Sequence, residues 1–238
     1  LSLAYAEKVR KLLLKTRKSK VGRIFIKKIK TKGDIFNKRT ISEIGGKNVF
    51  CKELEEQLSK KKIDIAIHSL KDMDSSERKK LIIGAYIKRN DPRDVLISRD
   101  KKKFQNLPKN SVIGTSSFRR EFQLKRIRND LTYKLIRGNV DTRIKKLKNK
   151  LYDAIILSYA GLKSLKMVNS ISQVFSLSEI IPSAGQGIIA LQCRKNDNKI
   201  IKLLKNINHL QTEKCANAER DVLKVLDGDC ETPVGVNA

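Results

Sequence analysis

The sequence is poor in aromatic residues, histidines and paired cysteines, and each shortage argues against a class of function. Aromatic residues make up 5% of the 238 residues and tryptophan is absent, so few side chains could stack on nucleic-acid bases. The four cysteines are far apart and form no C-x-x-C pair, and only two histidines accompany them. We therefore expect no metal site, and reduced thiols in an intracellular compartment. No apolar run approaches the ~20 residues of a membrane-spanning helix, so we expect no membrane segment.

Basic charge, by contrast, is abundant. The chain has 53 lysines and arginines against 25 acidic residues, a formal net charge of +28. A nucleic-acid binder shows such an excess, but so does a composition that has drifted toward lysine. The lysines are spread along the whole chain, with groups at 27–30, 60–62, 101–103 and 145–148. This spread favours drift, and we expect no nucleic-acid partner.

Hydrophobic periodicity predicts an α/β fold. Helical spacing appears at 3–13, 51–62 and 206–226, and residues 30–48 have the composition of a loop. Strands are predicted at 23–29, 63–67, 81–87, 95–98, 153–157 and 188–192. Glycine- and proline-marked segments near 88–92 and 182–187 predict two crossings between a sheet domain and a second sheet domain inserted into it. Two such domains can close around a ligand by a hinge motion at the two crossings.

The stretch from 114 to 148 is the most informative part of the chain. A strand at 111–113 runs into Gly-Thr-Ser-Ser, and a helix follows from about Phe118 with Arg119 and Arg120 in its first turn. A second strand at 133–136 delivers Arg137 into a Gly-Asn turn, and Asp141 or Thr142 is predicted to cap a helix that carries Arg143. Free N–H groups at helix starts and guanidinium forks both bind anions. The two turns therefore predict a cradle for a ligand with several carboxylates or phosphates, although solvated surface arginines are the common alternative.

A second candidate site follows the strand at 63–67, which ends on His68-Ser69-Leu70-Lys71-Asp72. Ligands of open α/β sheets bind at the carboxyl ends of strands. His68 alone is more often a hydrogen-bonded structural residue than a catalyst, and Asp72 could equally serve as a turn or cap residue. The residue types leave both interpretations open.

Eight stretches, in order, give the chain a specific resemblance. They are NVFCKELEEQL (48–58), DIAIHSLKDM (64–73), NDPRDVLIS (90–98), GTSSFRREFQL (114–124), IRGNVDTRIKKL (136–147), YDAIILSYAGL (152–162), PSAGQGIIALQCR (182–194) and AERDVLKVLDGDC-TPVG (218–235). The sequence resembles the porphobilinogen deaminase family, also called hydroxymethylbilane synthase. The resemblance implies an α/β fold with two periplasmic-binding-protein-like (type II) α/β domains and a truncated third α+β domain. The expected boundaries are 1–88 with 187–205, 89–186, and 206–238.

The resemblance also implies roles for individual residues. Asp72 matches the catalytic aspartate, and Cys230 matches the cysteine that carries a dipyrromethane cofactor through a thioether. Residues that match those holding the acetate and propionate groups of the cofactor and growing chain are Lys71, Ser117, Arg119, Arg120, Arg137 and Arg143. Further implied substrate contacts are Ser69, Gln186, Lys163 and Phe50, of which Phe50 has the alternative of a core residue. Where the family usually places another arginine, this chain has Ser164, for which Lys163 or Lys166 could compensate.

The activity implied is that of a transferase of tetrapyrrole (haem) biosynthesis. It condenses four porphobilinogen molecules on the covalent primer and releases hydroxymethylbilane and ammonia. The family suggests a monomer in the cytoplasm, or in plastids. The strand that normally supplies an arginine and a serine is absent before Leu1, and most of the third domain is expected beyond Ala238. One alternative is a solute-binding module of the same two-jaw fold without catalysis; a nucleic-acid binder is the other.

Overall fold

The computed structural model describes residues 1–16, 23–31, 51–75, 79–228 and 232–238. The chain divides into two compact units. The inserted unit is Asn90–Gly187, joined by residues 232–237, and the discontinuous unit is Ser2–Arg89 together with residues 188–228. The chain passes from one unit to the other at Arg89–Asn90 and again at Gly187–Ile188. A separate third domain at 206–238 stays a prediction.

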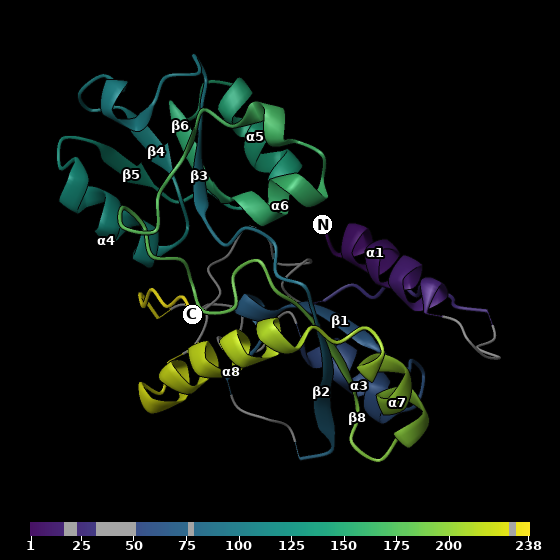
Figure 1. The fold of residues 1–238 in the computed structure, drawn as a ribbon. Helices are drawn as coiled ribbons and strands as arrows, with labels where there is room; N and C mark the ends of the chain where they lie inside the picture. Colours follow the sequence, from purple (N-terminus) through teal and green to yellow (C-terminus); the bar gives the residue numbers. More distant parts are fainter. Residues whose placement is uncertain (17–22, 32–50, 76–78, 229–231) are drawn as a thin grey trace. The chain divides into compact units, whose positions relative to one another are not determined.

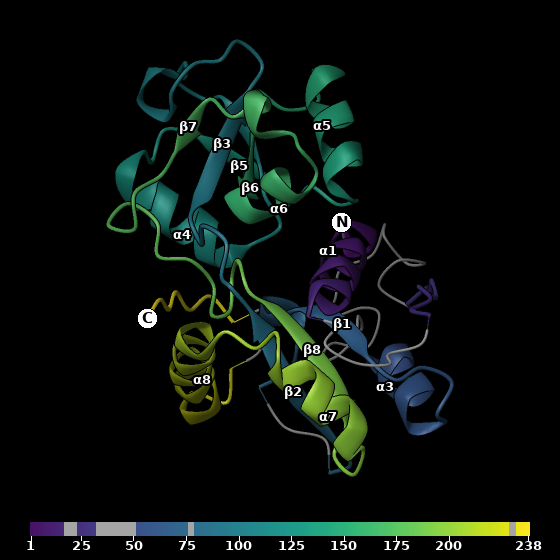
Figure 2. The same cartoon turned by 45° about the vertical axis from the view of Figure 1, so that its right-hand side comes forward.

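The inserted unit is a mixed five-stranded sheet with helices on both faces (Figures 1 and 2). Its strand order is β5-β4-β6-β3-β7. The strands are β3 (Asp94–Ser98), β4 (Val112–Gly114), β5 (Thr132–Lys134), β6 (Ala154–Ser158) and β7 (Gln173–Val174). Strand β4 is parallel to both β5 and β6, whereas β3 runs antiparallel to β6 and β7. The carboxyl ends of β4, β5 and β6 therefore meet at one edge, where the antiparallel β3 begins.

Alternating strand residues divide the core of this unit between two layers. On one face, Leu96 and Ile156 pack with Leu124 of α4 (Phe118–Ile127). On the other face, Val95, Ile97, Ile155 and Leu157 pack with residues of α5 (Val140–Lys148) and α6 (Tyr159–Ser164). Two short 3-10 turns, η3 (Phe104–Asn106) and η4 (Val168–Ser170), complete the unit. Burial on both faces explains why the central strands β3 and β6 are continuous apolar runs.

The discontinuous unit is built on a three-stranded antiparallel sheet in the order β1-β8-β2 (Figure 1). Its strands are β1 (Ala66–Ser69), β2 (Leu81–Ile87) and β8 (Ile189–Arg194). The helices are α1 (Ser2–Lys15), α3 (Lys52–Ser59), α7 (Asn198–Lys205) and α8 (Leu210–Val225), and the 3-10 turn η2 (Leu70–Asp72) follows β1. Residues of α1 and α7 share one core cluster with β2 and β8. Ala216 of α8 joins a separate cluster that includes Leu70.

Three local predictions are corrected by the structure. The strand predicted at 23–29 is wrong, because residues 23–30 form neither helix nor strand and pair with none of the described strands. Its alternation is nevertheless visible, since Ile24 and Ile26 are half-buried while Phe25 is 82% exposed. An alternating pattern cannot form a strand without a neighbour to supply the ladder of hydrogen bonds.

The other two corrections concern ends of elements. The N-cap of α5 is Asn139, in an extended conformation, so neither Asp141 nor Thr142 caps it; both lie inside the first turn. The strand predicted at 63–67 instead occupies 66–69, so His68 belongs to the strand and not to the turn after it.

The helices predicted at 3–13, at 51–62 and from Phe118 are confirmed. Helix α7 and strand β7 were not predicted. Among the described residues, no helix has both the length and the apolar character needed to span a membrane.

Candidate functional site

The turn that carries Asp72 is anchored by a buried residue on each side of the half-buried pair Lys71 and Asp72. The Leu70 N–H donates to the Ile188 carbonyl at 3.0 Å, and the Met73 N–H donates to the Leu70 carbonyl at 3.0 Å. Leu70 and Met73 are buried, whereas Lys71 and Asp72 are half-buried. The turn therefore presents an ammonium and a carboxylate side by side at the end of β1, directly after half-buried Ser69.

His68 is not exposed at this site. The residue is 5% exposed, and its ring is hydrogen-bonded to two buried neighbours, Cys51 and Gln192. Burial lowers the pKa of His68 to about 4, against the smaller opposing effect of the hydrogen bond to Gln192. The ring is thus neutral at physiological pH, which fits the structural interpretation of this histidine.

Two of the predicted cradle arginines are buried and bind an aspartate of their own unit. Arg119 is 3% exposed. Its Nη2 donates to Asp94 Oδ2 at 2.8 Å, its Nη1 to the Ile181 carbonyl at 2.6 Å, and its Nε to Ser183 Oγ at 3.1 Å. The guanidinium therefore joins the first turn of α4 to the start of β3 and to the segment at 181–183.

Arg120 is 6% exposed and approaches the same carboxylate from the other side. Its Nε and Nη2 donate to Asp94 Oδ1 at 3.1 and 2.7 Å, and its Nη1 donates to the Ile156 carbonyl at 3.2 Å. Gln186 completes the cluster, because its Nε2 donates to Asp94 Oδ1 at 2.9 Å and to the Pro92 carbonyl at 2.6 Å. We call Asp94, Arg119, Arg120 and Gln186 the Asp94 cluster.

The electrostatics of the Asp94 cluster favour ionised side chains. Burial by itself would raise the pKa of fully buried Asp94, but the charges of Arg120 and Arg119 and the bonds from Arg120 and Gln186 lower it to about 2. Burial lowers the pKa of Arg119, and Asp94 opposes that effect. With one carboxylate and two guanidiniums, the cluster carries a net charge of about +1 at neutral pH. In this structure the guanidiniums of Arg119 and Arg120 bind acceptors of the protein itself.

The remaining predicted residues of the inserted unit lie at the same edge of its sheet. Ser117 is the N-cap of α4; its own N–H donates to Thr115 Oγ1 at 3.2 Å. Arg137 follows β5, and Arg143 lies in α5 with its Nε donating to the Gly138 carbonyl at 2.7 Å. Because β4 and β5 are parallel neighbours, both turns are brought to one edge. Arg137 and Arg143 are half-buried, in contrast to the buried Arg119 and Arg120.

Ser164 stands where the resemblance leads us to expect an arginine, and its hydroxyl is bound within its own helix. Ser164 Oγ donates to the Ala160 carbonyl at 2.8 Å, within α6. Lys163 is exposed, and its charge contributes to the lowered pKa of Asp91, after the larger effect of Arg93. Lys163 and Lys166 are both exposed, so either stays a candidate for the cation next to this position.

Two predicted residues, Phe50 and Cys230, lie outside the described residues. Among those that are described, no group of three or more histidine, cysteine or acidic side chains could hold a metal ion.

Sequence reasoning missed Asp94 as a site residue, although the motif NDPRDVLIS contains it. Nothing in that motif tells which of its aspartates meets the arginines, so only the fold could identify it.

The fold and the site define a class: a two-unit α/β protein with an arginine-rich sheet edge in one unit and a Lys-Asp turn in the other. The sequence model described as "Porphobilinogen deaminase, dipyromethane cofactor binding domain" matches residues 1–202. The chain belongs to the porphobilinogen deaminase family.

Relatives agree with this assignment. Porphobilinogen deaminase of Alkaliphilus metalliredigens is 43% identical over 208 residues, which cover 87% of this chain and 66% of that protein. The Rickettsia prowazekii protein of the same name is 46% identical over 209 residues, covering 87% of this chain and 70% of the relative. The chain thus spans about two thirds of the length of these relatives. Apart from these relatives, a comparison with solved structures finds similarity to a putative methionine-binding lipoprotein from Bacillus subtilis, with 14% identity and a TM-score of 0.45 over 79% of this chain and 83% of that one.

Proposed function

We propose that this chain acts as a porphobilinogen deaminase. It is then a transferase that condenses four porphobilinogen molecules head to tail on a covalent dipyrromethane primer and releases hydroxymethylbilane and ammonia. The observation that carries the proposal is the family match over residues 1–202, in a domain named for that cofactor. The order of the matching motifs and the two α/β units support it.

Asp72 is the proposed catalytic group. Loss of ammonia from porphobilinogen leaves a cationic, azafulvene-type electrophile. A fixed carboxylate that accepts hydrogen bonds from pyrrole N–H groups stabilises positive charge there and can move a proton. The buried residues on either side of the Lys71–Asp72 pair support this role, because they hold the carboxylate on a turn with little freedom.

The proposed anion-binding residues match the ligand in charge. Each pyrrole ring brings two carboxylates, so the growing chain needs many cations. The residues proposed to hold them are Lys71, Ser117, Arg119, Arg120, Arg137 and Arg143, with Ser69, Gln186, Lys163 and Phe50 as further substrate contacts. Bound dipyrromethane would supply the nucleophilic pyrrole carbon that is extended. The net positive charge of the Asp94 cluster and the half-buried Arg137 and Arg143 fit such a polycarboxylate.

Cys230 is the proposed attachment point, through a thioether. The proposal also places the protein in the cytoplasm, with plastids as the alternative, as a monomer that binds neither nucleic acid nor membrane. Residues 206–238 would begin the third domain.

The test is the intact mass of the purified protein under denaturing conditions, beside a Cys230→Ser control. The expected result is an added mass of two linked pyrrole units in the wild type and none in the control. A loaded protein that consumes porphobilinogen supports the whole proposal. Unmodified protein that binds a porphyrin-like anion reversibly would instead favour the solute-binding alternative. An adduct that persists in the control would refute the attachment at Cys230.

A further inference from the structure

A chain of buried polar side chains lies behind the turn that carries Asp72. It begins at Glu55 on α3, continues through Gln192 on β8 and His68 on β1, and ends at Cys51, which precedes α3. All four residues are buried. Buried polar groups are stabilised only when they are hydrogen-bonded, so the bonds within this chain fix its members.

The hydrogen bonds of this chain have a defined direction. Gln192 Nε2 donates to Glu55 Oε1 at 3.1 Å, so Gln192 Oε1 faces His68 Nε2, also at 3.1 Å. An amide oxygen only accepts, and therefore His68 carries its proton on Nε2. The lone pair of the ring then lies on Nδ1, 3.5 Å from Cys51 Sγ. The carboxylate of Glu55 thus sets the tautomer of a histidine two hydrogen bonds away.

The sheet holds this arrangement in place. In the β1–β8 register, Ala66 is opposite Gln192 and His68 is opposite Ala190. His68 and Gln192 are therefore diagonal neighbours on one face, within reach of each other. The low pKa of His68 agrees with a neutral ring that can keep a single tautomer.

Cys51 links the histidine to the catalytic turn. Its Sγ lies 3.7 Å from the main-chain carbonyl oxygen of Asp72, within reach of an S–H···O hydrogen bond. The single S–H hydrogen is shared between two acceptors, this carbonyl and His68 Nδ1, so the protonation of Nδ1 decides which of them it binds. We propose that His68 is a positioning residue whose tautomer, through Cys51, sets how firmly the main chain of Asp72 is held. The proposal rests on the proposed function, in which Asp72 is catalytic.

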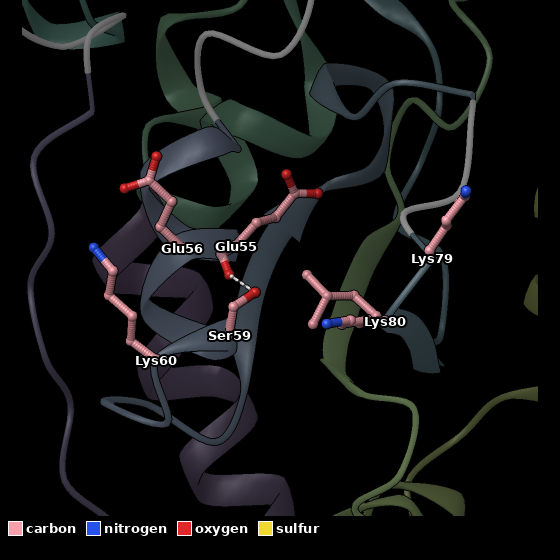
Figure 3. A pocket seen from close by; sticks show the side chains of 7 residues that line it. Glu55, Glu56, Ser59, Lys60, Lys79 and Lys80 are labelled. Atoms are coloured by element: carbon pink, nitrogen blue, oxygen red, sulfur yellow. Dashed lines mark hydrogen bonds between the residues drawn. The ribbon is translucent and has the colours of Figure 1, made fainter.

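Glu55, at the other end of this series of hydrogen bonds, can be substituted without changing any residue of the turn Leu70–Asp72. A cavity of about 310 Å³ lies beside α3 and is lined by Glu55, Glu56, Ser59, Lys60, Lys79, Lys80 and Leu81. Figure 3 shows side chains that line it. Ser59 Oγ donates to the main-chain carbonyl of Glu55 at 2.8 Å, so the Glu55 carboxylate does not depend on this serine. Glu56 is the exposed neighbour on the same helix and lines the same cavity. Glu56→Gln is therefore the matched control for Glu55→Gln.

The first experiment measures the tautomer of His68 by 15N NMR and needs no enzymatic activity. A His209→Gln variant assigns the two histidine signals. The wild type and Glu56→Gln should show a neutral ring protonated on Nε2. In Glu55→Gln the new amide can donate to Gln192, which lets Gln192 turn its own NH2 toward the ring and moves the proton to Nδ1. The same tautomer in all three proteins would overturn the proposed control of His68 by Glu55.

The second experiment tests the effect on the turn in two independent ways. Hydrogen exchange at the Leu70 and Met73 amides should become about three- to tenfold faster in Cys51→Ala, the scale of one lost hydrogen bond, and return toward wild type in Cys51→Ser. In the cofactor-loaded protein, kcat for porphobilinogen should fall by a similar factor with little change in KM. A wild type without turnover would refute the proposed function, and the exchange rates would still decide the positioning role. Unchanged exchange and unchanged kcat in Cys51→Ala would overturn it.

Discussion

Replacing Asp94 with asparagine is the perturbation with the largest expected effect on stability. The substitution keeps the shape of the side chain but removes the charge that Arg119 and Arg120 share. It also places an NH2 group near guanidinium N–H groups, which are donors as well. Two buried guanidiniums would then lack their counter-charge. We expect the inserted unit to be strongly destabilised.

Two independent arguments give the expected loss in the free energy of unfolding for Asp94→Asn. Removing one partner of a buried ion pair typically costs about 3–5 kcal/mol. Independently, the pKa of Asp94 falls from 3.8 to about 2 on folding, which corresponds to about 2 kcal/mol at neutral pH. Because the folded-state pKa is the lower one, this stabilisation is present above pH 3.8 and is lost as the pH falls toward 2. The penalty for Asp94→Asn should therefore be constant between about pH 5 and 8 and shrink below about pH 4.

Hydrogen exchange at the β3 and β6 amides measures the opening free energy of the inserted unit alone, and denaturant unfolding gives a second measure. The matched control is Asp91→Asn, which removes an ion pair to an arginine whose side chain is 43% exposed. The pair is partly exposed, with the Asp91 side chain at 21%, and a pair of this kind contributes about 1 kcal/mol or less. The reasoning is refuted if Asp94→Asn costs no more than the control, or if its cost does not decrease at acid pH.

The remaining predictions concern catalysis, the backbone and the helix cap. Asp72→Ala should abolish porphobilinogen turnover while the circular dichroism spectrum stays unchanged, since the side chain is half-buried; near-normal turnover would contradict the catalytic role. Gly187→Ala should destabilise the protein by about 1–3 kcal/mol, because its φ is +86° and a Cβ would lie 2.6 Å from the Asn90 carbonyl oxygen. Thermal unfolding that matches the wild type would show that the segment can move aside. Asp197→Ala should cost about 1 kcal/mol, because this side chain caps α7 through the Ile200 N–H and also binds Arg194, and an unaltered unfolding midpoint would argue against that cap.

The sequence alone determined the class of fold and the family. Apolar runs predict β2, β3 and β6 because strands buried on one or both faces need such residues locally. The helical spacing of α1, α3 and α4 is likewise a local property of the chain. The order of eight motifs specifies the family without reference to the fold, because motifs are a property of the linear sequence. The placement of Arg137 and Arg143 after a strand, at a sheet edge, was also accessible in this way.

Only the tertiary structure decided which groups meet. Asp94 lies 25 and 26 residues from its two arginines, and Gln192 lies 124 and 137 residues from His68 and Glu55. The sequence could predict arginines at a helix start, but not that a buried aspartate would bind them. The alternation at 23–29 likewise predicted a strand. An alternating pattern indicates that one side of a segment is buried, but it does not show whether another strand lies beside it to form hydrogen bonds. Local pattern specifies which elements form, whereas hydrogen-bond partners depend on how distant strands align, and that alignment is set by packing of the whole unit.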